Sequence, residues 1–281
     1  MNIQLDDIRD DITRAVRIAL EEDIGTGDIT ALLIPEDKIS TATVITREDC
    51  VLCGQAWFDE VFAQLGGIDD ITWHYKDGDW VEANATLVTL KGNARKLLTG
   101  ERTALNFVQL LSGTATKSRE YAKLVEGTGV KVLDTRKTIP GLRTAQKYAV
   151  ACGGCHNHRI GLYDAFLIKE NHIAACGGIA EAVAKAREVA PGKPIEVEVE
   201  NIVQLHETLC QNVNRVMLDN FDRNSVHEAC TLAIGQAELE ASGNITVITV
   251  RETANLGIHY ISTGAITKEC IAVDLSMRLA I

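Results

Sequence analysis

The chain has 281 residues, of which 46% are hydrophobic and 24% charged, and this composition predicts a large folded core rather than disorder. The formal net charge of -11 argues against a general nucleic-acid-binding protein, because phosphate binding needs a dominant basic surface. No apolar run approaches the roughly 18 residues of a membrane span, and the acidic N-terminus does not resemble a signal peptide. We therefore expect a cytoplasmic protein without a membrane or nucleic-acid partner, in which the eight cysteines are free thiols.

The first part of the chain predicts a mixed domain of helices and antiparallel strands over residues 1–112. Apolar residues at helical spacing predict an opening helix over residues 8–20, and a second helix is expected over 95–121. Strand-like runs lie between them, at residues 42–46, 71–75 and 86–90. Residues 77–87 also resemble part of a lipoyl or biotinyl carrier domain, but no lysine stands in the required hairpin context, which favours a packing domain.

Beyond residue 112 the sequence predicts a parallel α/β barrel. A short apolar run that ends on charged, polar or glycine residues recurs six times, at residues 130–133, 165–168, 195–201, 216–218, 239–244 and 259–262. Helix-length segments separate these runs, and polar groups at strand carboxyl ends are the usual active site of such a barrel. Residues 271–281 alternate apolar and polar residues, which leaves open whether they return to the first domain.

The charges at these expected strand ends indicate an anionic substrate. The early strands supply cations, namely Arg136, Lys137, His158, Arg159 and Lys169. Arginine suits bidentate binding of carboxylates, whereas lysine supplies a point charge.

The middle and late strands carry a different chemistry. Alternation places Glu196, Glu198 and Glu200 on one face of a strand, where burial requires a cation or a polar ligand. Glu198 with Asp219 could hold sugar hydroxyls or a hard cation such as Mg²⁺, or could form structural ion pairs. The later turns at 242–244 and 263–265 contain glycine and are expected to precede helices, whose backbone N–H groups can cradle a phosphate.

Two cysteine motifs allow other interpretations. Residues 152–156 match the Cys-x-x-Cys-His signature of haem c attachment, which normally takes place outside the cytoplasm. Cys50 and Cys53 form a second Cys-x-x-Cys pair, so that zinc or iron-sulfur binding together with Cys152 and Cys155 stays open. Of the remaining histidines, His172 is a candidate for the mouth of the site because it closely follows Lys169.

Eight short segments occur in a fixed order along almost the whole chain. They are EDIGTGDIT at 22–30, ERTALN at 101–106, DTRKTIPGLR at 134–143, HR at 158–159, KENH at 169–172, EVE at 196–198, LDN at 218–220 and SGN at 242–244. This ordered set closely resembles the quinolinate phosphoribosyltransferase family. The resemblance implies an N-terminal α+β domain, sandwich-like, followed by an incomplete parallel α/β barrel at 113–281. The implied reaction joins quinolinate and phosphoribosyl pyrophosphate, with Mg²⁺, to give nicotinate mononucleotide, pyrophosphate and CO₂ in NAD biosynthesis.

The resemblance also implies a role for each matching residue. Cations of the early strands would hold the quinolinate carboxylates, Lys137 and Arg102 would face pyrophosphate or the carboxylates, and the late turns would hold the 5-phosphate. Lys137, Glu198 and Asp219 are the expected catalytic residues, and the two carboxylates would engage the ribose hydroxyls and Mg²⁺. The resemblance further implies a homodimer in which Arg102 reaches the neighbouring site. The full predicted site is Arg102, Thr135, Arg136, Lys137, His158, Arg159, Lys169, Glu198, Asp219, Ser242, Gly243, Asn244, Thr263, Gly264 and Ala265.

A related phosphoribosyltransferase acting on nicotinate or another nitrogen base is the alternative within the same fold. The number of cations near residues 136–169 matches two carboxylates better than one, which favours quinolinate over a monocarboxylate.

Overall fold

The computed structural model describes residues 2–280, which form two compact units. The first unit holds the residues up to Arg119, the segment Thr138–Gly154 and the residues from Ile266 onward. The second unit holds Glu120–Lys137 and Cys155–Ala265. The expected domain boundary near residue 112 stays a prediction. No helix in the described part of the chain combines the length and the apolar character needed to cross a bilayer.

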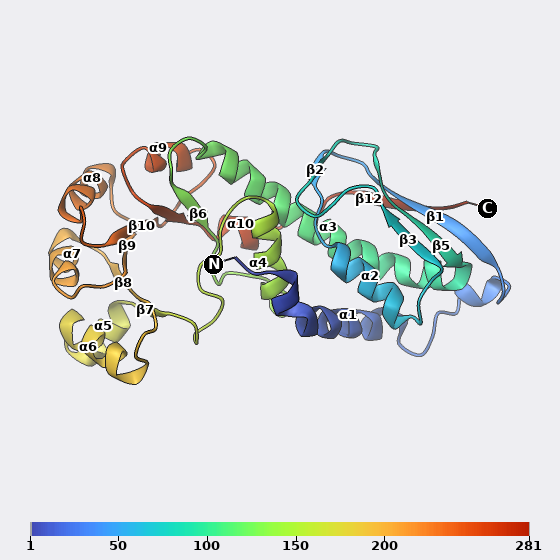
Figure 1. The fold of residues 1–281 in the computed structure, drawn as a ribbon, viewed down its shortest axis with the longest axis horizontal. Coiled ribbons are helices and arrows are strands. Elements are labelled where there is room, and N and C mark those ends of the chain that lie inside the picture. The colour runs from blue at the N-terminus through green and yellow to red at the C-terminus, as the bar shows by residue number, and fades with distance from the viewer. Residues whose placement is uncertain (1, 281) are drawn as a thin grey trace. The chain divides into compact units, whose positions relative to one another are not determined.

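The first unit contains an antiparallel sheet of four strands in the order β12-β1-β5-β3 (Figure 1). Burial alternates along β1, as expected for a sheet with one face packed on a core. A separate two-stranded sheet pairs two short strands. The strands are β1 (Ile39–Thr46), β2 (Cys50–Val51), β3 (Asp70–Trp73), β4 (Trp80–Val81), β5 (Thr86–Asn93) and β12 (Leu275–Ala280).

Helices of the first unit begin with η1 (Leu5–Ile8) and α1 (Arg9–Ile24), close to the helix expected from the apolar spacing. Ile12, Val16 and Leu20 are buried at intervals of four residues, and this places one face of α1 against the core. The other helices are η2 (Ala31–Leu33), α2 (Gln55–Gln64), α3 (Ala94–Leu124) and α4 (Arg143–Cys152).

The end of the chain returns to the first sheet, where β12 pairs with β1 in an antiparallel register. On the way it passes over α3: the Val273 backbone N–H donates to the Gln109 carbonyl at 3.1 Å. A side chain at Gly113 of α3 is impossible here, because a Cβ atom would lie 1.9 Å from the Ile271 carbonyl oxygen. Glycine therefore lets the terminal segment approach the helix closely.

The second unit is built on a parallel sheet of six strands in the order β6-β11-β10-β9-β8-β7. All six strands predicted from the repeating apolar runs are present. They are β6 (Lys131–Leu133), β7 (Phe166–Ile168), β8 (Ile195–Val199), β9 (Arg215–Asp219), β10 (Glu238–Ser242) and β11 (Tyr260–Ser262). The sheet is open between β6 and β7 among the described residues, as the expectation of an incomplete barrel requires.

Helices connect successive parallel strands and cover the sheet. Asn201 caps α7 by accepting a hydrogen bond from the Gln204 N–H, and Asp222 caps α8 in the same way through Ser225. The helices of this unit are α5 (Glu170–Cys176), α6 (Ile179–Val189), α7 (Ile202–Leu209), α8 (Arg223–Leu232) and α9 (Val250–Ala254), whereas α10 (Ala265–Lys268) follows β11 and belongs to the first unit from Ile266 onward.

Candidate functional site

Parallel pairing brings the predicted site residues of the second unit to one edge of its sheet. Ser242 at the end of β10 pairs with Asp219 at the end of β9, and Ser262 of β11 pairs with Leu133 of β6. Because neighbouring strands run in the same direction, the residues that follow each strand emerge side by side. Every predicted site residue except Arg102 belongs to this unit.

Two arginines of the early strands lie in a partly buried environment. The Arg136 Nε is buried and has no hydrogen-bond partner among the described residues. Arg159 donates from Nη1 to the Ala165 carbonyl at 3.2 Å, and burial followed by the nearby Arg136 charge lowers the pKa of Arg159. An anion beside Arg159 would offset the unfavourable effect of burial and of the nearby Arg136 charge on the Arg159 guanidinium.

His158 lies above a buried pair of carboxyl groups. Its Nε2 is 2.8 Å from Glu196 Oε2 and 3.6 Å from Glu240 Oε2, and its backbone N–H donates to the buried Asp134 at 2.8 Å. Arg215 reaches the same pair, with Nη1 3.1 Å from Glu240 Oε2. Burial raises the pKa of Glu196 and of Glu240 to about 7, against the opposing charge of Arg215. The pair therefore holds a proton near neutral pH.

The two predicted carboxylates of the middle strands differ in their partners. Glu198 forms an ion pair, whereas Asp219 forms none within the described residues. Glu198 of β8 forms an ion pair with Lys169, which directly follows β7. This contact supplies the cation that alternation along residues 195–200 requires. Asp219 ends β9 and accepts a hydrogen bond from Asn220 Nδ2 at 3.0 Å. Glu200 lies beyond β8 and is exposed, so the expectation that it shares the inner face with Glu196 and Glu198 was wrong.

The two glycine turns differ in their relation to helices. The turn at 263–265 leads directly into α10, and the Ala265 N–H donates to Thr263 Oγ1 at 3.2 Å. A Cβ atom at Gly264 would lie 2.9 Å from Lys137 Cδ and 3.4 Å from Thr135 Oγ1, so this turn lies against the loop after β6.

The turn at 242–244 precedes α9, as expected, and a short loop separates it from the start of this helix at Val250. The chain reverses here through left-handed residues, with φ of 99° at Gly243 and 51° at Asn244, and this geometry delays the helix. Asn220 also has a positive φ of 54°, and its Oδ1 accepts from Asn244 Nδ2 at 3.4 Å. The two loops that follow β9 and β10 are therefore hydrogen-bonded to each other.

Two predicted residues stand apart from this group. Arg102 is an exposed residue of α3 and belongs to the first unit, whereas the other residues of the predicted site belong to the second unit. His172 accepts the Lys169 backbone N–H at its Nδ1 at 3.0 Å, and this contact caps α5. His172 therefore has a structural role that accounts for its position after Lys169.

Sequence reasoning missed Glu240 and Arg215, which complete the buried network below His158. Glu240 occupies the inward position of the run Leu239-Glu240-Ala241, as Glu196 does in its own strand. The alternation rule that identified Glu196 would have found Glu240 too. Arg215 begins β9, at the amino end of the strand, where the search for polar strand ends did not extend.

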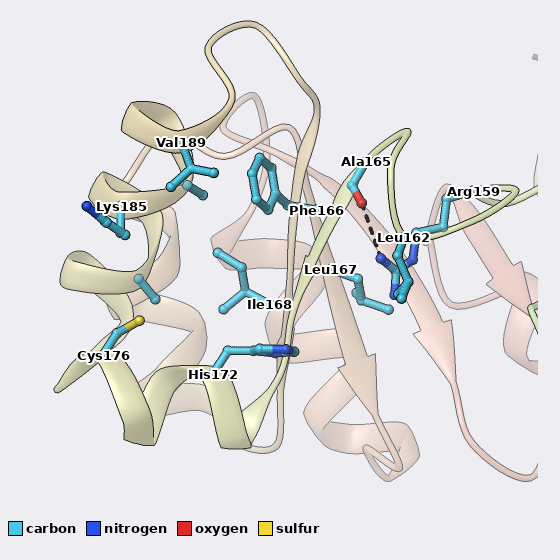
Figure 2. Close-up of a pocket in the computed structure, with 12 residues that line it drawn as sticks. Arg159, Leu162, Ala165, Phe166, Leu167, Ile168, His172, Cys176, Lys185 and Val189 are labelled. Carbon is cyan, nitrogen blue, oxygen red and sulfur yellow. Dashed lines mark hydrogen bonds between the residues drawn. The ribbon is translucent and has the colours of Figure 1, made fainter.

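A cavity of about 310 Å³ lies between β7 and the helices α5 and α6 (Figure 2). Phe166 and Ile168 of the strand line it together with Ala182 and Val189 of α6. Arg159 is the predicted site residue found in its lining within the described chain. The cavity is mainly apolar and is separate from the carboxylates and glycine turns at the strand ends.

Comparison with known proteins identifies both parts of the chain. Residues 28–112 match the quinolinate phosphoribosyl transferase N-terminal domain, and residues 114–278 match the C-terminal domain of the same family. The chain is 40% identical over 261 residues to "Probable nicotinate-nucleotide pyrophosphorylase [carboxylating]" of Bacillus subtilis (strain 168), with 92% of this chain and 90% of the relative covered.

Solved structures agree with these matches. The nicotinate-nucleotide pyrophosphorylase from Francisella tularensis is 51% identical, with a TM-score of 0.92 and 96% of both chains covered. That from Ehrlichia chaffeensis is 38% identical, with a TM-score of 0.90 and 100% of both chains covered. The chain is thus a member of the quinolinate phosphoribosyl transferase family.

Proposed function

We propose that this protein transfers the phosphoribosyl group of phosphoribosyl pyrophosphate to quinolinate and releases CO₂, forming nicotinate mononucleotide for NAD biosynthesis. The observation that carries the proposal is the order of charges along one sheet edge. Arginine and lysine follow β6 and β7, carboxylates end β8 and β9, and glycine turns follow β10 and β11. This order provides separate places for a dicarboxylate, a sugar and a phosphate.

Quinolinate would be held by Arg136, Arg159 and Lys169, with His158 beside them. The buried Nε of Arg136 supports this role, because an unpaired buried donor is costly unless a ligand accepts from it. Burial raises the pKa of Glu196 and of Glu240, so this pair beneath His158 would carry less negative charge under the substrate than two ordinary carboxylates. The planar guanidinium group of arginine can also form two hydrogen bonds at once with a planar carboxylate, of which a pyridine dicarboxylate has two.

Phosphoribosyl pyrophosphate would extend across the later strands. The turns at 242–244 and 263–265 would hold the 5-phosphate, and Glu198 with Asp219 would accept hydrogen bonds from the ribose hydroxyls. Lys137 would face the pyrophosphate together with Thr135. The close packing of the Lys137 side chain over Gly264 supports this assignment, since it places a cation beside a proposed phosphate turn.

The carboxylates fit a role in binding Mg²⁺. This ion usually takes one or two protein carboxylates and fills its other positions with water and substrate phosphate oxygens. Glu198 and Asp219 lie on neighbouring strands and offer only oxygen ligands. When bound, Mg²⁺ would neutralise part of the pyrophosphate charge.

The chemistry needs no covalent enzyme nucleophile. As the C1–O bond to pyrophosphate breaks, positive charge develops on the ribose and negative charge on the leaving group. The carboxylates near the ribose and the cations near pyrophosphate would stabilise both charges, and one such preorganised group is typically worth about 3–4 kcal/mol. The pyridine nitrogen forms the new bond to C1 and becomes cationic. It then stabilises the carbanion left when the adjacent carboxylate departs as CO₂, and a proton replaces that carboxylate.

We further propose that the active form is a homodimer in which Arg102 completes the site of the neighbouring chain. An exposed arginine on a long helix can serve a second chain, and Arg102 has this position on α3. The expected cytoplasmic location stays a prediction.

The decisive experiment follows CO₂ and pyrophosphate release together, with quinolinate and then with nicotinate as the acceptor. We expect equal amounts of both products from quinolinate and neither from nicotinate. Pyrophosphate release with nicotinate alone would contradict the substrate assignment. We also expect Lys137→Ala and Arg102→Ala to lose most of the turnover, and near-normal activity of both would contradict their roles.

A further inference from the structure

Three potential metal ligands meet in the first unit, in a cluster formed by Cys53, Asp77 and Cys152. One ligand atom of each residue lies within 4.8 Å of those of the other two. The cluster takes one cysteine from each Cys-x-x-Cys pair, although the two pairs are far apart in the sequence. Cys50 and Cys155, the other members of those pairs, do not belong to it. The cluster is independent of the residues proposed for phosphoribosyl transfer.

The backbone fixes Cys53 and Asp77 relative to each other. Cys53 is fully buried, and its N–H donates to Ser112 Oγ at 2.9 Å. Asp77 Oδ1 accepts the N–H of the next residue, Gly54, at 3.0 Å. Asp77 Oδ2 accepts from the Tyr148 hydroxyl at 2.9 Å. The carboxylate is therefore held in place at both oxygens.

Arg119 fixes Cys152 relative to the same turn. Its Nη2 donates to the Gly78 carbonyl at 3.0 Å, and its Nε donates to the Gly153 carbonyl at 3.0 Å. These two glycines directly follow Asp77 and Cys152. Gly153 has no space for a side chain, because a Cβ atom would lie 2.3 Å from the Ala115 carbonyl oxygen. One guanidinium group thus holds two ligand-bearing segments together, and such preorganisation favours ligand binding.

The chemistry of the cluster suits a thiophilic divalent cation. All its members are acids: burial raises the pKa of Cys53 well above its ordinary value and that of Asp77 to about 6. Burial and the neighbouring Asp77 also raise the pKa of Tyr148. The nearby guanidinium of Arg119 donates to backbone carbonyls, so it serves the scaffold rather than the acids.

Geometry favours zinc among such cations. Ligand atoms around tetrahedral Zn²⁺ lie roughly 3.5–3.8 Å apart, given Zn–S and Zn–O distances of about 2.3 and 2.1 Å. The ligand atoms of the three residues lie within 4.8 Å of one another, so a small side-chain adjustment would bring them to that arrangement.

We propose that Cys53 Sγ, Cys152 Sγ and Asp77 Oδ2 form a binding site for Zn²⁺, with water as the fourth ligand. Cys152 and Asp77 are only half-buried, so ion and water can enter from their side. Binding replaces the two thiol protons, which are released, and involves no change of oxidation state. The ion links the segment after β2, the turn before β4 and the end of α4, and its role is structural.

The test uses the full-length protein after treatment with a chelator and a reductant. Zn²⁺ is titrated in competition with a chromophoric chelator, and we expect one tight site per chain. Cys53→Ala, Cys152→Ala and Asp77→Asn should each weaken Zn²⁺ binding by at least about 100-fold, whereas Tyr148→Phe should weaken it by about 10-fold as an outer-shell partner. Cys50→Ala and Cys155→Ala are the matched controls and should bind Zn²⁺ like the unchanged protein.

A second measurement keeps the result clear if a variant is destabilised. In this measurement Co²⁺ takes the place of Zn²⁺. The unchanged protein should show the near-ultraviolet absorption of charge transfer from thiolate to cobalt, and Cys152→Ala should show less of it. The circular dichroism spectrum of Cys152→Ala should stay the same, which shows that the variant is folded. Zn²⁺ should also raise the thermal midpoint of the unchanged protein but not that of Cys152→Ala. Equal Zn²⁺ affinity in the unchanged protein and Cys152→Ala would overturn the proposal. So would a Cys53–Cys152 disulfide in the purified protein whose reduction does not produce Zn²⁺ binding.

Discussion

His158 Nε2 lies 2.8 Å from Glu196 Oε2, and Glu240 Oε2 lies 3.6 Å from the same nitrogen. The imidazole is one of the predicted cationic side chains of the early strands, and it contacts two carboxyl groups that are buried in the sheet. Glu240 is fully buried and Glu196 almost so, and Arg215 contacts the pair from the amino end of β9. The charge of His158 and the protonation of this pair are therefore linked.

The first prediction concerns stability against pH. The pKa of Glu196 and of Glu240 is about 7 in the folded chain, above the ordinary value of 4.5. Between pH 4.5 and 7 these two groups hold more protons in the folded chain than in the unfolded chain, so their contribution to the free energy of unfolding falls as pH rises through this window. We expect Glu240→Gln to reduce this fall by up to about 3 kcal/mol, measured by urea unfolding from pH 4.5 to 8.

Glu238→Gln is the control for this experiment. Glu238 lies on the same strand and is exposed, and its Oε2 is 3.8 Å from Arg215 Nη2, so its substitution changes one contact of Arg215 but removes no carboxyl group from the buried pair. We therefore expect a much smaller change in the slope of stability against pH than in Glu240→Gln. Glu240→Gln also loses the contact with Arg215, which lowers stability at every pH. The raised pKa of the pair is therefore tested by the slope of the free energy of unfolding against pH, not by its absolute value. If the free energy of unfolding has the same slope against pH in Glu240→Gln and in the unchanged protein, the raised pKa of this pair is contradicted.

Arg136→Ala should separate binding from stability. Its Nε has no partner within the described residues, so truncation removes no protein hydrogen bond at that atom. We expect kcat/KM for quinolinate to fall by about 100-fold, as for loss of a charge-assisted contact, while the thermal midpoint stays the same or rises. Arg187→Ala is the control, because Arg187 donates to carbonyls of residues 211 and 212, before β9. Loss of stability without a change in kcat/KM would contradict the role of Arg136.

Gly264→Ala tests the packing of Lys137 over the turn. The new methyl group would lie 2.9 Å from Lys137 Cδ, and the lysine side chain must move. We expect turnover to fall by about 10- to 100-fold, because a displaced cation no longer fits the developing charge. A double-mutant cycle checks the cause: Lys137→Ala should lose as much activity alone as together with Gly264→Ala. Fully additive losses would show that the glycine acts through another contact.

Mixed dimers test the proposed contribution of Arg102 to the neighbouring site. Arg102→Ala and Glu198→Gln should each be inactive as purified variants. If Arg102 acts on the partner chain, an equal mixture after subunit exchange should regain about one quarter of the unmixed activity, since half the dimers contain one complete site. No recovery after exchange, verified by differently tagged chains, would place Arg102 and Glu198 on the same chain's site.

Local sequence patterns were sufficient for the strands of the second unit and the charges at their ends. Each strand is a run of apolar residues closed by a polar one, and parallel pairing brings such ends together whatever the details of packing. The Lys169–Glu198 ion pair illustrates this, because alternation along residues 195–199 required a cation for Glu198. The sequence also predicted a helix after the glycine turn at 242–244, and α9 follows it, but the left-handed backbone at Gly243 and Asn244 was seen only in the structure.

Contacts between distant segments required the tertiary structure. The sequence by itself determined the family, the six parallel strands and the residue types at their carboxyl ends, because these depend on short-range periodicity and local motifs. Only the tertiary structure decided that Glu240 and Arg215 meet below His158, and that Cys53 lies close to Cys152 although the two are far apart in the sequence. The physical reason is that side chains meet according to strand register and helix packing, which the spacing of residues along the chain does not specify.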